Sequence, residues 1–129
     1  MGQHMNERTN TLVITDRTSG SVVCTQGVLA NTFGTRLFGL LGKKGLEEGS
    51  GLLIRPSSGV HTFGMSFPID IVSLDRNDRV IGAFENIGAG TIRGLSVKTR
   101  SVLELPAGRI RECGIKSGDE LVMVHQSSS

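Results

Sequence analysis

The 129-residue chain has the usual length of one domain, enough to bury a core without metals or disulfides. Its residues are 37% hydrophobic and 20% charged, a balance that excludes an intrinsically disordered chain. The 14 basic and 12 acidic side chains are interspersed, and Trp and Tyr are absent, so the composition argues against a nucleic-acid partner.

The two cysteines, Cys24 and Cys113, lie far apart, and neither belongs to a CxxC or Cys/His pattern with metal-ligand spacing. We therefore expect two buried small thiols and no metal or cofactor, and a disulfide between them stays open only if the fold brings them together. No apolar run reaches the ~18 residues that a membrane span requires.

The chain begins with a polar segment, MGQHM, that lacks the apolar centre of a signal peptide and resembles a vector-derived extension. Residues 1–7 are expected to lie outside the fold, residues 8–125 to form a single globular domain, and residues 126–129 to be a frayed tail. The chain as it stands is expected in the cytoplasm, and export or membrane tethering stays open if a leader was removed.

The N-terminal third predicts a hairpin followed by a short helix. Two β-branched runs, residues 11–15 and 21–24, flank a polar turn and are typical of a hairpin. Large apolar residues recur at helical spacing between residues 33 and 41. This spacing predicts a helix that begins at residue 31 or 32 and ends near residue 42.

The middle of the chain predicts four strands, at residues 51–55, 60–63, 69–75 and 79–85. The third of these is apolar on both faces at its start, which predicts a central strand. A short polar turn joins it to the fourth strand in the clearest hairpin of the chain. The glycine-rich stretch 86–98 has little periodicity and predicts an exposed loop.

The C-terminal part predicts a strand at 101–105, a helical turn at 109–113 and a last strand at 119–124. Together the elements predict a mainly β fold with a minor α component. We expect a small, partly closed antiparallel or mixed sheet or barrel with one or two short helices.

Four motifs carry a resemblance to a known family, and they read RLFGLLG at 36–42, HTFGMSFPID at 61–70, VLELPAG at 102–108 and GIKSGD at 114–119. In this order they resemble the domain of unknown function 192 family, also called uncharacterised ancient conserved region proteins. The match spans about residues 8–125. The ten-residue string at 61–70 is the most specific of the four.

The resemblance implies a small, mainly β protein of bacteria or archaea with no established activity, and many relatives that are exported or membrane-tethered. One departure from the family pattern is visible. Asn77-Asp78 stands where a turn of the Asp-Gly kind is usual, so Asp78 is expected to adopt a positive φ.

Asp70 is the first candidate functional residue. It shares a strand face with Val72 and Leu74, so it is expected at the edge of the core, where a carboxylate needs partners. Arg36, Arg55 or backbone N–H groups are the candidates. Asp70 is then either a structural carboxylate that binds the strand start or the helix region, or a general base or ligand-orienting group.

His61 lies nine residues before Asp70, and a turn at Pro68 would bring the two side chains together as the orienting pair of an acid–base site. Such a site also needs a nucleophile, and no nearby Ser or Thr stands in a nucleophile elbow. A hydrolase-like enzyme that uses His61 and Asp70 is therefore an alternative to a non-catalytic role.

Glu104 alternates with Leu103 and Leu105, so it is expected to face solvent if those two leucines face the core, with Arg36 or Arg100 as an ion-pair partner. Apolar side chains in the kinked string at 61–70 line either the core or a pocket. The predicted binding set is Arg36, Arg55, His61, Phe63, Met65, Asp70 and Glu104.

We expect a non-catalytic module that binds a small ligand, a peptide or a protein partner through these residues. Two alternatives stay open. The first is the hydrolase-like enzyme, and the second is an assembly component of the cell envelope, which rests only on the export of relatives. The sequence does not identify the ligand or the oligomeric state.

Overall fold

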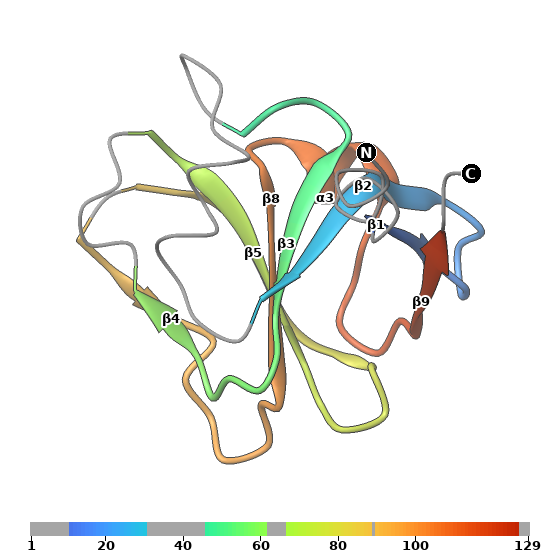
Figure 1. Ribbon diagram of the computed structural model, residues 1–129. Helices are drawn as coiled ribbons and strands as arrows, with labels where there is room; N and C mark the ends of the chain where they lie inside the picture. The colour runs from blue at the N-terminus through green and yellow to red at the C-terminus, as the bar shows by residue number, and fades with distance from the viewer. Residues whose placement is uncertain (1–10, 31–45, 62–66, 89, 127–129) are drawn as a thin grey trace, which may run out of the picture.

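The computed structural model describes residues 11–30, 46–61, 67–88 and 90–126 (Figure 1). In chain order its elements are β1 Thr11–Asp16, β2 Val22–Ala30, β3 Ser50–Ile54, β4 Val60–His61, β5 Ile69–Leu74, β6 Val80–Ile87, β7 Ile92–Arg93, β8 Ser101–Pro106, α3 Arg109–Cys113 and β9 Leu121–Gln126. The predicted helix between residues 31 and 42 lies outside the described residues.

Seven strands form one mixed sheet in the order β6-β5-β8-β3-β2-β1-β9. Among these described strands, only β2 and β3 pair in parallel. The sheet curls without closing, but an isolated bridge between Arg79 and Glu120 joins its two edges at one end. The N–H of Val80 also donates to the Asp119 carbonyl at 2.8 Å there. The predicted mainly β, partly closed sheet is therefore confirmed.

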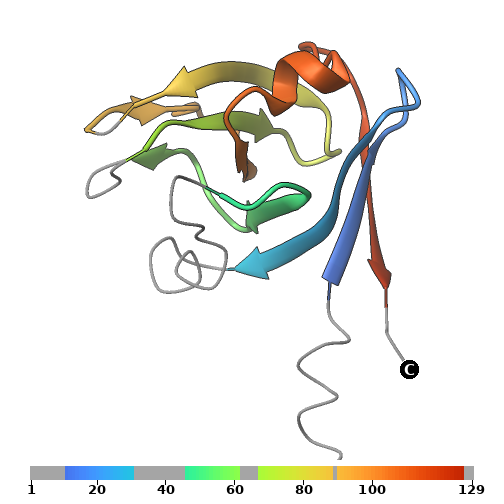
Figure 2. The same ribbon diagram turned by 90° about the horizontal axis from the view of Figure 1, so that it is seen from above.

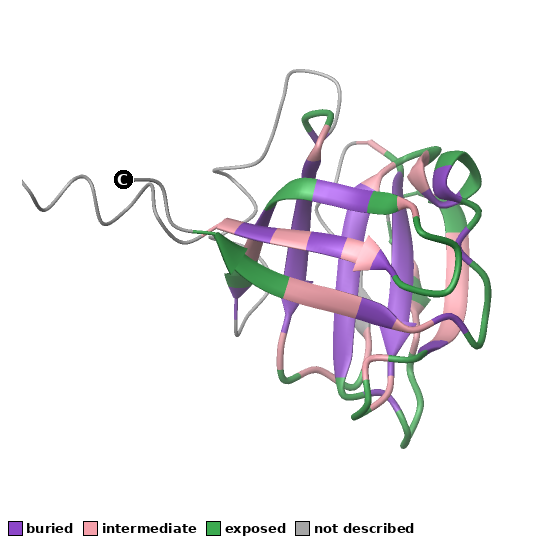
Figure 3. Cartoon of the chain, turned by 90° about the vertical axis from the view of Figure 1, so that its right-hand side faces the viewer, coloured by how far each residue is buried: buried purple, intermediate pink, exposed green. Residues whose placement is uncertain are grey.

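The curled sheet buries an apolar cluster on each face. The helix-side cluster lies on the face that α3 covers (Figure 2), and its largest members are Leu12, Ile14, Leu53, Leu74, Leu103, Leu105, Ile110, Ile115 and Leu121. The far-side cluster lies on the opposite face and contains Ala30, Leu46, Leu52, Ile54, Ile69, Ile71 and Val102. The central strands are thus buried on both faces, whereas β9 becomes exposed toward its C-terminal end (Figure 3).

The predicted central strand and its hairpin are both present. β5 is buried along its whole length because β6 and β8 flank it and both of its faces are covered. The turn into β6 forms because the Asp75 carboxylate accepts the N–H groups of Asn77 and Arg79, at 2.8 and 3.0 Å. Asp78 adopts a φ of 60°, which confirms the expected left-handed conformation.

The predicted loop at 86–98 is only partly correct. β6 continues to Ile87, and the two residues of β7 pair with β4 in a separate two-stranded sheet, Val60 opposite Arg93 and His61 opposite Ile92. A strand of two residues is too short to show an alternating pattern, so the sequence carried no signal for it. No helix in the described part of the chain is long and apolar enough to cross a membrane.

Both cysteines are free and buried, as expected from their spacing. Burial raises the pKa of the Cys24 thiol to about 11, and burial also raises the pKa of Cys113. We expect neither thiol to react with a disulfide reagent in the native protein at neutral pH, and both to react in guanidinium chloride. Thiol titration by absorbance measures this, and fast labelling of native Cys24 would contradict it.

Candidate functional site

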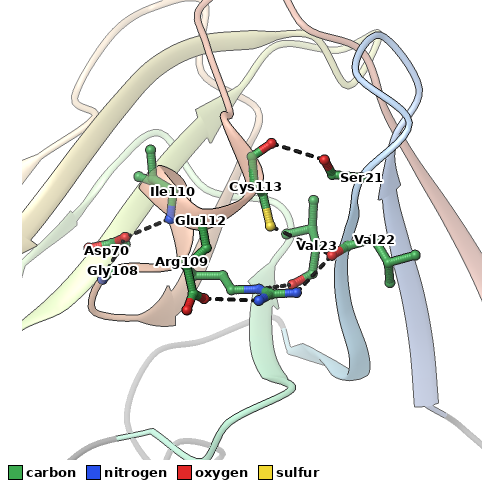
Figure 4. Close-up of polar contacts among 9 residues, drawn as sticks. All are labelled: Ser21, Val22, Val23, Asp70, Gly108, Arg109, Ile110, Glu112 and Cys113. Atoms are coloured by element: carbon green, nitrogen blue, oxygen red, sulfur yellow. Dashed lines mark hydrogen bonds and ion pairs between the residues drawn. The ribbon is translucent and has the colours of Figure 1, made fainter.

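Asp70 lies on the helix-side face of β5 and is completely buried. One of its oxygens accepts the N–H of Asn86 at 2.8 Å, and the other accepts the N–H groups of Gly108 and Ile110 at 3.1 and 2.8 Å (Figure 4). Gly108 presents its N–H from a φ of 96°, a conformation that favours glycine. The carboxylate therefore joins β5 to β6 and to the start of α3, and both of its oxygens are occupied by backbone donors.

Arg109, at the start of α3, holds the helix against β2. Its guanidinium donates to the carbonyls of Val22 and Val23 at 2.8 and 2.9 Å, and to the Glu112 carboxylate at 3.0 Å (Figure 4). Through these contacts Arg109 ties α3 to β2.

Arg55 does not contact Asp70. Its Nε donates to the Ser101 hydroxyl at 2.8 Å, and its Nη2 forms an ion pair with Asp78. Burial raises the pKa of Asp78, and the neighbouring guanidinium opposes that rise. Arg55 thus ties the end of β3 to the β5–β6 turn, and its role as a partner of Asp70 is ruled out.

The string at 61–70 is only partly described. The backbone of His61 lies in β4, at the side of the molecule away from α3 and Asp70's partners (Figures 1 and 2). Phe63 and Met65 lie outside the described residues, as does Arg36. Asp70 already binds three N–H groups on the helix side, so the structure offers no support for a His61–Asp70 acid–base pair.

Glu104 is the residue for which the sequence-based expectation is wrong. It was expected to face solvent, yet it is 0% exposed. It lies opposite Leu52 of β3 and Ile71 of β5, both members of the far-side cluster. Alternation with Leu103 and Leu105 holds, but both faces of this central strand are buried, so pointing away from one cluster means pointing into the other.

Neither carboxyl oxygen of Glu104 has a hydrogen-bond partner among the described residues. Arg100, one of its two expected ion-pair partners, instead donates to the carbonyls of Val97 and Thr99 at 2.7 and 3.3 Å, and the other, Arg36, lies outside the described residues. Burial raises the pKa of Glu104 to about 8, so the side chain is mostly a neutral acid at neutral pH. Glu104 is thus a carboxylic acid that can donate a proton and become a carboxylate, and apolar side chains surround it.

A hollow of about 370 Å³ opens on the far-side face of β5, the face on which Glu104 is buried. Ser73 and Phe84 form part of its lining, and Phe84 also packs on the far-side cluster. Ser73 pairs with Val102, and Glu104 pairs with Ile71, so Ser73 and Glu104 are diagonal neighbours on β5 and β8. This hollow could not be predicted from local patterns, because its lining comes from strands and a loop that are distant in the chain.

A third buried acid, Asp16, was not singled out from the sequence. One oxygen accepts the N–H groups of Thr18 and Ser19 at 3.0 and 3.2 Å, whereas the other receives no donor from the described residues. Burial, and then the adjacent Asp119 carboxyl, raise the pKa of Asp16. Asp16 and Asp119 lie where the two edges of the sheet meet. The hydrogen bonds of Asp16 to Thr18 and Ser19 stabilise the turn there.

Two solved structures share this architecture. A protein of unknown function from Novosphingobium aromaticivorans is 25% identical, with a TM-score of 0.67 over 86% of this chain and 82% of its own. A Sinorhizobium meliloti protein titled "putative transcription regulator" is 20% identical, with a TM-score of 0.65 over 87% of this chain and 91% of its own, a likeness that shows the fold alone. No curated protein matches the chain.

The fold places the chain in a class of small proteins built on an open, curled, mainly β sheet. In this chain the sheet also buries an acid, Glu104, on its far-side face. The chain belongs to the Uncharacterized ACR family, domain of unknown function 192, which matches residues 14–123. The resemblance carried by the four motifs is thereby confirmed. Asp70 and Glu104 each stand in one of those motifs.

Proposed function

We propose that the protein is a non-catalytic binding module, and that it takes a small ligand on the far-side face through Glu104. The observation that carries the proposal is the unpaired burial of this carboxyl among Leu52, Ile71 and Val102. A buried carboxyl without a partner lowers the stability of the fold, and destabilising groups of this kind are common at functional sites.

The chemistry of Glu104 suggests the kind of ligand. A neutral carboxyl can donate one hydrogen bond and accept others, and it can ionise when a cation arrives. Ile81 and Phe84 give the neighbouring hollow an apolar part of its lining, which suits an apolar body, and Lys98 is the one cation among its described lining residues. A ligand with an aliphatic part and an amine or guanidine group fits both features.

A non-catalytic role is favoured over the hydrolase-like enzyme by the state of Asp70. Both of its oxygens bind backbone N–H groups and the side chain is completely buried, so Asp70 is not open to a substrate. Catalysis through Glu104 would require a second reacting group, and the only other hydroxyl described at the hollow besides Ser73 belongs to Ser96.

The test is a thermal-unfolding screen against alkylamines and alkylguanidines, with alcohols and carboxylic acids of matched chain length. We expect the cationic compounds to raise the melting temperature of the wild type and to have no effect on Glu104→Gln. The exposed glutamate Glu48 provides the control, because Glu48→Gln should respond like the wild type. Equal responses of wild type and Glu104→Gln would refute the proposed site.

A further inference from the structure

Two apolar side chains project from the loop between β7 and β8. Leu95 is 72% exposed and Val97 is 90% exposed, the highest values for large hydrophobic residues in the described chain. Side chains this exposed contribute almost nothing to the folding free energy through burial. Their presence together at one loop tip forms an exposed apolar feature of the kind that marks interaction sites.

The loop holds a defined shape, so this exposure is a feature of its folded conformation. The Thr99 hydroxyl donates to the Gly94 carbonyl at 2.8 Å, and the Thr99 N–H donates to the Ser96 carbonyl at 3.1 Å. The N–H of Ser96 reaches the Ser58 carbonyl at 3.2 Å. Thr99 is itself buried, so the hydrogen bond from its hydroxyl holds the loop against the body of the protein.

Cationic side chains lie beside Val97 of the apolar tip. Arg76, Lys98 and Arg100 line a hollow of about 220 Å³ together with Val97. The described residues supply no ion-pair partner to any of these three cations. The hollow also contains Asp75, whose Oδ1 is occupied by the backbone N–H groups of the β5–β6 turn.

We infer that this loop docks the protein on an anionic lipid surface. Leu95 and Val97 enter the headgroup region, and Arg76, Lys98 and Arg100 bind the negative charge of the lipids. Projecting apolar tips suit a soft surface, whereas a protein partner would need a pocket shaped for them. A symmetric second copy is disfavoured, because it would place the same cations against one another.

The test is cosedimentation of the full chain with phosphatidylcholine vesicles, with and without phosphatidylserine. We expect binding only to the phosphatidylserine vesicles, weakened by added salt. Leu95→Ser/Val97→Ser should weaken binding by more than tenfold, and Lys98→Ser by roughly fivefold. Val124→Ser is the matched control, since Val124 is 56% exposed on β9 and should not matter.

Three results would overturn the inference. The first is no binding to phosphatidylserine vesicles at low salt. The second is binding that the loop variants leave unchanged while circular dichroism shows them folded. The third is a concentration-dependent dimer, seen in sedimentation velocity, that Leu95→Ser/Val97→Ser abolishes, because the loop would then meet a second copy.

Discussion

Replacing Asp70 with alanine should destabilise the protein by about 4 kcal/mol or more, a large share of the stability of an ordinary domain. The substitution leaves the N–H groups of Asn86, Gly108 and Ile110 without their acceptor in a buried setting. Each buried donor without a partner costs about 1–3 kcal/mol. Asp70→Asn keeps one acceptor oxygen and should lose roughly half as much.

Denaturant unfolding followed by far-ultraviolet circular dichroism measures these losses, because the chain has no Trp or Tyr for fluorescence. Asp75→Ala is the matched control. Asp75 also accepts two backbone N–H groups, but at a turn that water reaches, so its loss should be about 1 kcal/mol. Equal stabilities for Asp70→Ala and the wild type would contradict the structural role of this carboxylate.

Much of the fold could be predicted because its elements have clear local signals. The β5–β6 hairpin follows from an apolar run and a polar turn, and α3 occupies the predicted residues Arg109–Cys113. β7 could not be predicted, since its two residues pair with β4 only through the tertiary fold. The parallel pairing of β2 with β3 likewise depends on how distant segments come together.

The candidate site was less predictable, for a physical reason that Glu104 illustrates. Alternation gives the direction of a side chain relative to its strand neighbours, but it does not tell whether the opposite face is covered. For Asp70, alternation correctly placed the carboxylate on the face of Val72 and Leu74. Its actual partners, the N–H groups around α3, come from residues about forty positions away, which no local pattern reveals.

Replacing Glu104 with methionine should instead stabilise the protein, by about 3 kcal/mol near neutral pH. The pKa of Glu104 is raised from 4.5 to about 8 in the folded protein, so the native state retains a proton that the unfolded chain releases. Stability of the wild type should therefore fall as the pH rises from about 4.5 to about 8. The total loss of wild-type stability across this pH range corresponds to roughly 5 kcal/mol as an upper limit.

The variant removes this pH dependence because methionine has similar length and no ionisable group. Its advantage over the wild type should be largest above about pH 8 and should shrink to about 1 kcal/mol near pH 4.5, where only the unpaired neutral carboxyl remains. Chemical unfolding across this range measures the trend, with Glu48→Met as the exposed control. If Glu104→Met proved less stable than the wild type at high pH, Glu104 would have a stabilising partner, and the argument for a ligand would fail.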